Sequence, residues 1–381
     1  MTAIQAWFEE CRSGAASLHK DCQPAPCTPP RLISVGLGGT TPRLVQPSPG
    51  ERVEYTALSY CWGSNPPIRT MKSTLPVFSD ELALDQLPKT FTDAIQITRA
   101  LGIPYIWIDA LCIVQDDSEE WQAVAAKMDS VYLGSQLTIA AAQTANSFYG
   151  CLNSDPLLDG VHHHEDDMFF RTPSLPGTDE QLLVRVYTAD PRSRIQKTPL
   201  GDRGWTLQEH LLSHRTAFCM RPEVYWGCQA SYQSQCGLHL TSDEIARGET
   251  TLPLMRGSNT ATPLTSSDWH RVCAMYSRRD LTFPRDRIPA IAGITRYFAE
   301  RMERRPIVGL WEETFSRDLA WVRASRHIMP KFSSLTDSVP SWSWLACPSS
   351  VYYPLDLDSA GGRVEHVKLV EWDVKWEVRV V

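Results

Sequence analysis

An alternation of strand-like and helix-like segments between residues 55 and 142 constrains this fold more than any other feature of the sequence. Residues 55–61 and 136–142 are short β-like runs, and residues 103–109 are almost continuously apolar. A run of that kind is typical of a strand buried on both faces of a sheet. The sequence therefore predicts three strands, each separated from the next by a helix.

The two segments between these strands carry the signals of helices. In residues 87–101 apolar side chains recur at helical spacing, Pro88 suits the first turn, and Gly102 supplies a stop. The second helix is predicted to begin after Asp117, in a capping-box-like pattern, and to end at Gly134. This order with short links predicts an α/β fold, a parallel sheet with helices on its faces.

Outside this core the sequence divides into three further parts. Residues 1–50 are weakly patterned and predict an N-terminal extension, with an edge strand at 31–36. Residues 145–200 hold a Pro- and Ser-rich stretch and predict an inserted region of loop and strand. Residues 231–381 predict a C-terminal region of helices with a β-rich end, packed on the main domain at 51–230.

Composition and charge exclude several classes of protein. With 43% hydrophobic and 21% charged residues, the chain is neither disordered nor fibrous in type. A net charge of −7 without a Lys- or Arg-rich run disfavours nucleic acid as a partner, and no apolar run is long enough to span a membrane. Eleven irregularly spaced cysteines, and a start at Met1 without the pattern of a secretory leader, favour free thiols in the cytoplasm.

Four strings carry a family resemblance and follow one another in order: Leu58-Ser-Tyr-Cys-Trp-Gly63, Trp107-Ile-Asp-Ala-Leu-Cys-Ile-Val-Gln-Asp-Asp117, Arg203-Gly-Trp-Thr-Leu-Gln-Glu209 and Pro340-Ser-Trp-Ser-Trp344. Together with Leu87-Pro-Lys-Thr-Phe-Thr-Asp-Ala94 they resemble the HET (heterokaryon incompatibility) domain family. The resemblance implies a HET domain at 51–230 with an insertion at 145–200. It also implies a TIR-like parallel sheet, and a fungal protein of nonself recognition and regulated cell death.

The same resemblance implies an activity. The family is similar to TIR domains, some of which cleave NAD, and Trp205-Thr-Leu-Gln-Glu209 is similar to the Trp-Cys-x-x-Glu string that carries their catalytic acid. Thr206 stands here at the Cys position of that string. One hypothesis is therefore a cell-death module that hydrolyses an NAD-like nucleotide or self-associates. The alternatives are a stand-alone enzyme of fungal secondary metabolism that uses the same pocket, and a scaffold without chemistry.

Ligands of open parallel sheets bind outside the carboxyl ends of the strands. Asp109 closes the apolar strand, and Tyr60 and Trp62 close the first one, so these side chains are predicted to share one crevice. Asp109 is then either a base or an acceptor for a sugar hydroxyl. The alternative is that its carboxylate caps the following turn through backbone N–H groups.

The helix predicted at 205–214 carries the strongest catalytic candidate. Its apolar arc is formed by Trp205, Leu207, Leu211 and Leu212, and Trp205 is also predicted to bind substrate. Gln208 and Arg215 fall inside this arc, so both must be paired or must line a cavity as substrate-binding groups. Glu209 stands at the edge of the arc beside Trp205, where desolvation would raise its pKa toward general acid–base use. The alternative is a salt bridge between Glu209 and Arg203 or Arg215.

Five further residues complete the predicted site. His210, where the family tends to have Arg, points away from the apolar arc; this favours exposure, with a pocket role as the alternative. Cys112 is either a nucleophile or a small buried thiol. Gln115 and Asp116, in the same string as Asp109, and Arg203 are predicted to bind substrate.

No metal and no cofactor is predicted. The histidine run at 162–164 fits a solvated loop better than a metal site, because three consecutive side chains cannot share one regular face. Cys228 and Cys236 lack a second Cys-x-x-Cys pair, and the sequence has no Gly-rich phosphate loop. The partners expected are a small-molecule ligand and, through self-association, further copies of the chain.

Overall fold

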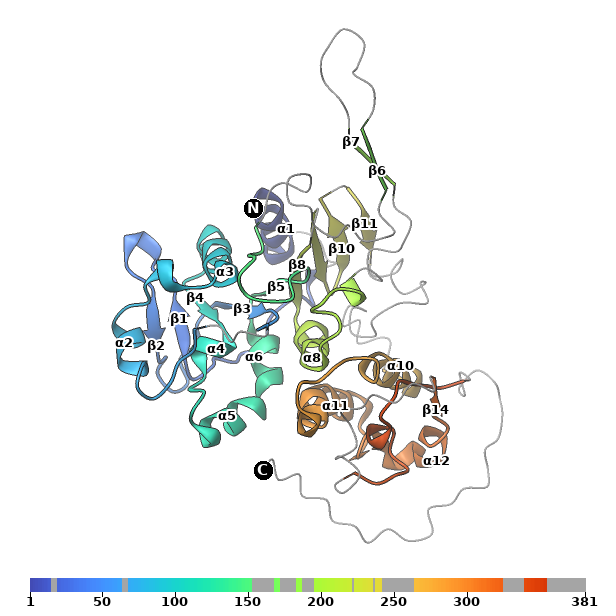
Figure 1. Cartoon of the computed structure of the whole chain (residues 1–381). Helices are drawn as coiled ribbons and strands as arrows, with labels where there is room; N and C mark the ends of the chain where they lie inside the picture. Colours follow the sequence, from blue (N-terminus) through green and yellow to red (C-terminus); the bar gives the residue numbers. More distant parts are fainter. Residues whose placement is uncertain are drawn as a thin grey trace.

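The computed structural model of this protein describes residues 1–14, 19–63, 68–152, 168–171, 183–186, 195–220, 223–235, 237–241, 264–324 and 339–354, of which 168–171 and 183–186 are described by their backbone alone. Figure 1 shows a sheet with helices around it and a separate group of helices toward the C-terminus. The helix α8 lies between these two parts.

Within the described residues, the main sheet has nine strands in the order β11-β10-β9-β8-β5-β3-β4-β1-β2. Its strands are β1 (Leu32–Ser34), β2 (Arg43–Val45), β3 (Tyr55–Ser59), β4 (Tyr105–Trp107), β5 (Leu137–Ala140), β8 (Arg215–Cys219), β9 (Val224–Cys228), β10 (Ser231–Ser234) and β11 (His239–Thr241). Three short antiparallel pairs lie outside it: β6 (Met168–Arg171) with β7 (Leu183–Val186), β12 (Pro306–Ile307) with β13 (Leu310–Trp311), and β14 (Val322–Arg323) with β15 (Val351–Tyr352).

The centre of the main sheet is parallel, as the sequence predicts. Strand β3 pairs in parallel with both β4 and β5, and β5 pairs in parallel with β8. Every residue of β3 and β5 is buried, which explains why these strands lack the apolar–polar alternation of an exposed sheet. The strands on both sides of this centre pair antiparallel, so the complete sheet is mixed. The α/β prediction is confirmed.

The helices are α1 (Thr2–Ser13), α2 (Leu75–Asp80), α3 (Lys89–Ala100), α4 (Asp109–Cys112), α5 (Ser118–Ala125), α6 (Met128–Gly134), α8 (Gly204–Leu212), α10 (Ser266–Tyr276), α11 (Pro289–Met302) and α12 (Phe315–Asp318). Short 3-10 turns are η2 (Leu37–Gly39), η3 (Leu84–Gln86), η5 (Pro284–Arg287), η6 (Glu312–Thr314) and η8 (Trp344–Ala346). Among the described residues, none of these helices combines the length and the apolarity needed to cross a bilayer.

Helix α3 forms where the sequence predicts it, but the helix predicted to run from Asp117 to Gly134 is two helices. Asp117 caps α5 by accepting the backbone N–H groups of Glu119 and Glu120. The side chain of Glu120 does not return to Asp117 as a capping box requires; it accepts the Val114 N–H at 2.9 Å. Helix α5 ends after Ala125, and α6 begins at Met128. The single-helix prediction was wrong because apolar spacing continued across this break.

The described part of the first 50 residues adds two strands and an α-helix to the fold. The strand predicted at 31–36 exists as β1 but is not an edge strand, because β1 pairs with β4 on one side and β2 on the other. Next to it, Arg31 forms a 2.6 Å ion pair with Glu120 of α5. Helix α1 buries Ile4 and Phe8 completely in the main core. Strands β1 and β2 have three residues each and are too short for a periodic signal, so the sequence did not predict their positions in the sheet.

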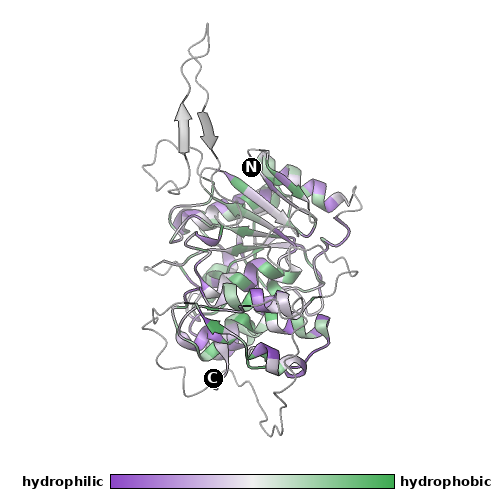
Figure 2. Cartoon of the chain, turned by 90° about the vertical axis from the view of Figure 1, so that its right-hand side faces the viewer, coloured by the Kyte–Doolittle hydropathy of each residue, from purple (hydrophilic) through white to green (hydrophobic). Residues whose placement is uncertain are grey.

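The C-terminal part forms its own hydrophobic core around α8. The helices predicted for this region include α10 and α11, and their apolar side chains pack on Leu207, Leu211 and Leu212. Figure 2 shows apolar and polar residues mixed along the helices of this part, as expected when each has one buried face. Most of the predicted β-rich end, the histidine run at 162–164 and Cys236 lie outside the described residues.

Candidate functional site

Two motifs meet where parallel strands β3 and β4 end. The indole Nε1 of Trp62, after β3, donates a 2.8 Å hydrogen bond to Oδ2 of Asp109, after β4. Tyr60 lies beside the same carboxylate, whose charge adds to burial in raising the pKa of the phenol. The parallel pairing of β3 with β4 explains the meeting, because it brings both carboxyl ends to one edge of the sheet.

Asp109 makes the local backbone contact that one of its two predicted roles requires, and its second oxygen faces the cluster. Its Oδ1 accepts the backbone N–H of Ala110 at 2.6 Å, a local bond at the start of α4, while Oδ2 faces Trp62. Burial raises the pKa of Asp109, and the hydrogen bond from Trp62 together with the nearby Tyr60 hydroxyl acts in the opposite direction by favouring the carboxylate. The local bond therefore leaves Asp109 as part of a polar cluster.

Glu209 reaches this cluster from α8. Its side chain is only 6% exposed, and burial raises its pKa to about 7. The Ser59 hydroxyl and the charge of Arg203 lower this pKa, whereas the charge of Asp109 raises it. The two carboxylates therefore act on each other electrostatically, and Glu209 can exchange a proton near neutral pH.

Arg203 supplies the positive charge of the cluster. It is the N-cap residue of α8, and its Nη1 donates a 2.8 Å hydrogen bond to the carbonyl oxygen of Tyr60. Burial lowers the pKa of Arg203, but Cys61 and the charges of Glu209 and Asp109 raise it, and the net shift is upward. Among the described residues, neither carboxylate forms an ion pair within 4.0 Å, so the salt bridge considered for Glu209 is not formed.

The sequence favours a solvent-exposed His210, but the side chain is half-buried against the end of the sheet. Its Nε2 lies 3.1 Å from Oγ of Ser59, and its ring meets Phe218 edge-on with centroids 5.2 Å apart. Burial and the charge of Arg279 lower the pKa of His210 to about 3, so the imidazole is neutral at pH 7. The physical reason is that α8 is covered on both sides, by the C-terminal core and by the end of the sheet.

Three predicted residues of the 203–215 segment lie elsewhere. Gln208 accepts the backbone N–H of Gly293 at 2.9 Å, and the indole of Trp205 donates to Asp286 at 3.2 Å, so both face the C-terminal part. Arg215 is the first residue of β8, at the amino ends of the parallel strands. The structure therefore separates Arg215 from Glu209 and Asp109 along the length of the sheet.

The other predicted residues make structural contacts. Cys112 is 2% exposed, its sulfur accepts the Ile108 N–H, and burial raises its pKa to about 12. Gln115 donates to the backbone carbonyl of Asp109 at 3.0 Å. Asp116 is exposed and accepts the Lys72 N–H, which fastens the preceding loop. A thiol held protonated in the core is a poor nucleophile.

Sequence reasoning missed two hydroxyl groups of the cluster, those of Ser59 and Tyr132. Ser59 ends β3 and directly precedes Tyr60, so the strand-end argument could have included it. Tyr132 comes from α6 and favours the ionised form of Glu209 through its hydroxyl. Its helical spacing predicts only a core residue. The same spacing fits an aromatic ring packed on Trp107 and a phenol hydroxyl that faces a site, so the sequence cannot distinguish the two.

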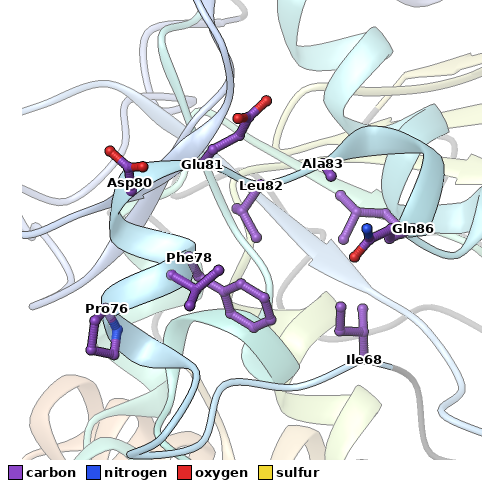
Figure 3. A pocket seen from close by; sticks show the side chains of 10 residues that line it. Ile68, Pro76, Phe78, Asp80, Glu81, Leu82, Ala83 and Gln86 are labelled. Atoms are coloured by element: carbon purple, nitrogen blue, oxygen red, sulfur yellow. The ribbon is translucent and has the colours of Figure 1, made fainter.

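An open groove of about 480 Å³ lies apart from this cluster (Figure 3). It is formed around α2 and η3, and its lining residues are Ile68, Pro76, Val77, Phe78, Asp80, Glu81, Leu82, Ala83, Gln86 and Leu87. The loop that carries Ile68 is joined to the cluster's neighbourhood, since the Thr70 N–H donates to the carbonyl oxygen of Ala110. Side chains suited to metal binding converge at another place, between α1 and β9.

The fold and the cluster define an α/β domain with a polar site at the carboxyl edge of its parallel strands. Residues 55–209 match the family model described as Heterokaryon incompatibility protein (HET), so this part of the chain is a HET domain. The match begins at the first residue of β3 and ends at Glu209, inside α8. Curated proteins yield no match, and solved structures yield none either.

Proposed function

We propose that this HET-domain protein acts in fungal heterokaryon incompatibility and the accompanying cell death by hydrolysing an NAD-like nucleotide. The observation that carries the proposal is the buried carboxyl of Glu209, with a pKa of about 7, in one cluster with Asp109 and Arg203. Perturbed carboxyl groups that converge at the carboxyl edge of a parallel sheet are typical of catalytic sites.

The chemistry assigns one role to each of the three residues. Breaking the bond between nicotinamide and ribose sends the bonding electrons to nicotinamide and leaves positive charge on the sugar. The carboxylate of Glu209 stabilises that charge and then accepts the proton of the attacking water, so NAD and water yield nicotinamide, ADP-ribose and a proton. Asp109 accepts a hydrogen bond from a ribose hydroxyl, and the positive charge of Arg203 attracts the phosphates of the nucleotide.

The test is direct measurement of nicotinamide release. Purified protein at high concentration is incubated with NAD, and nicotinamide is quantified by chromatography. The variant Glu209→Gln is expected to lose at least about a hundredfold in rate while circular dichroism stays unchanged. Glu54→Gln, at a surface ion pair with Arg12, is the matched control and should keep the wild-type rate. Constant NAD with wild-type protein would contradict the proposal.

A second candidate function is a stand-alone enzyme of fungal secondary metabolism. The groove at α2 and η3, rather than the polar cluster that the sequence predicted for this alternative, favours it, since about 480 Å³ with mostly apolar walls is the size of a small-molecule site. A thermal-shift screen with polyketide-like compounds tests it. A compound that raises Tm for the wild type but not for Phe78→Ala would support this alternative. If no compound does so and the protein hydrolyses NAD, the result would support NAD hydrolysis instead.

A further inference from the structure

Four side chains that commonly bind metals converge between helix α1 and strand β9. They are Cys11, His19, Cys22 and Cys228, here named the Cys3His cluster, and their ligand atoms all lie within 4.8 Å of one another. Nδ1 of His19 lies 3.7 Å from the sulfur of Cys22 and 3.7 Å from the sulfur of Cys228. All four residues are buried, with 4% or less of each exposed.

We propose that the Cys3His cluster binds one zinc ion in a tetrahedral structural site. With zinc–sulfur bonds of about 2.3 Å and zinc–nitrogen bonds of about 2.0 Å, tetrahedral ligands stand roughly 3.6–3.8 Å apart. The two His19 separations already have this value, and the widest pair needs to close by only about 1 Å. Small side-chain rotations therefore suffice to complete the site.

The chemistry of the four groups selects the type of metal. Three thiolates and one imidazole are soft and borderline ligands, which suit zinc, whereas calcium and magnesium require oxygen. Four protein ligands fill a tetrahedron and leave no position for water or substrate. Together with complete burial, this assigns a structural role rather than a catalytic one.

Arg215 provides the charge that such a site needs. Its Nε donates a 3.1 Å hydrogen bond to the sulfur of Cys11, and its guanidinium lies over the ring of Phe8, 5.7 Å from the centroid. Zinc with three thiolates and a neutral imidazole carries a net charge of about −1, which the buried guanidinium offsets. This contact gives a physical reason for an arginine that is only 1% exposed.

The proposed ion would fasten the N-terminal segment to the sheet. Cys11 is near the end of α1, His19 and Cys22 follow it, and Cys228 ends β9. All four positions lie outside residues 55–209, so the site is separate from the matched HET region. A metal that joins Cys22 to Cys228 closes a long loop, which restricts the conformations of the unfolded chain. The free energy of zinc binding is then added to the free energy of folding.

The first measurement is the metal content of the full-length protein. After purification without chelator, mass spectrometry of the elements is expected to find about one zinc per chain. Protein refolded with cobalt(II) should show the visible bands of tetrahedral cobalt and a thiolate charge-transfer band in the near ultraviolet. Cys228→Ser is expected to lose the ion, whereas Cys27→Ser, a half-buried cysteine outside the cluster, should retain it.

Measurements on the wild-type protein test the zinc site even if Cys228→Ser does not fold. Stoichiometric zinc in the wild type, released when its thiols are modified, supports the site without any variant. Folded wild-type protein without zinc and without the cobalt spectrum overturns the proposal. A disulfide between Cys11 and Cys22, found by non-reducing mass spectrometry of fresh protein, also overturns it. Glu209→Gln should keep its zinc, because the two sites are independent.

Discussion

Gly293 in α11 donates its backbone N–H to Oε1 of Gln208 in α8, at a distance of 2.9 Å. The bond joins the C-terminal core to the helix that carries Glu209 and His210. A 2.5 Å ion pair between Arg296 of α11 and Asp129 of α6 lies beside it. The orientation of the candidate catalytic helix therefore depends on a part of the chain that follows the matched HET region.

Gly293→Ala tests this dependence. An added Cβ would lie 2.6 Å from Oε1 of Gln208 and closer still to Cβ of Asp129, so α11 must move away from α8. We expect a loss of about 1–3 kcal/mol in the free energy of unfolding, measured with urea. Glu300→Ala, on the exposed side of the same helix, should change it by less than about 0.5 kcal/mol. Equal stability of the two variants would show that the helices are not tightly apposed.

Glu209 should make the protein less stable as the pH rises. Its pKa is about 7 in the folded state and about 4.5 in the unfolded chain, so between these values the folded state binds more protons. Stability is therefore lost as pH rises from about 4.5 to 7. Glu209→Gln removes this loss, and we expect the variant to exceed the wild type by on the order of 1–3 kcal/mol at pH 8 and by little at pH 4.5.

Urea unfolding across this pH range measures the difference. Glu54→Gln, which changes an exposed residue in the same way, serves as the control. A constant difference between Glu209→Gln and wild type at every pH would contradict a raised pKa for Glu209.

His210 should make the protein less stable as the pH falls, the opposite of the effect of Glu209. Its pKa falls to about 3 in the folded state, whereas in the unfolded chain it is about 6.5. Between these pH values the unfolded state therefore binds one more proton than the folded state. Stability is then lost as pH falls below about 6.5. We expect His210→Asn to lose less stability than the wild type between pH 7 and 5, with the exposed His239→Asn as control. Titration of the His210 ring near pH 6.5, seen by NMR, would refute this.

Cys112 is expected to be unreactive in the folded protein. It is buried, and its pKa of about 12 keeps the thiol protonated at neutral pH. Iodoacetamide followed by peptide mass spectrometry should label Cys112 only after denaturation, whereas the partly exposed Cys27 serves as an internal comparison. Rapid labelling of Cys112 in native protein would restore it as a candidate nucleophile.

Local sequence pattern determined the parallel centre of the sheet and one half of the candidate site. Strands β3, β4 and β5 are apolar enough to be read directly, and the residues after parallel strands must share an edge. Asp109, Tyr60 and Trp62 could therefore be placed together without coordinates. The helical arc of α8 likewise predicted which side packs on a core, because that pattern depends on neighbours in sequence alone.

Tertiary structure alone decided what lies on the other side of α8. His210 is half-buried because the end of β3 covers it, and Ser59 and Tyr132 approach Glu209 from separate elements. The Cys3His cluster joins Cys228 to residues more than 200 positions earlier, and no local spacing records that contact. Periodicity shows which face of an element is apolar, but the partner of a polar side chain depends on how distant segments pack.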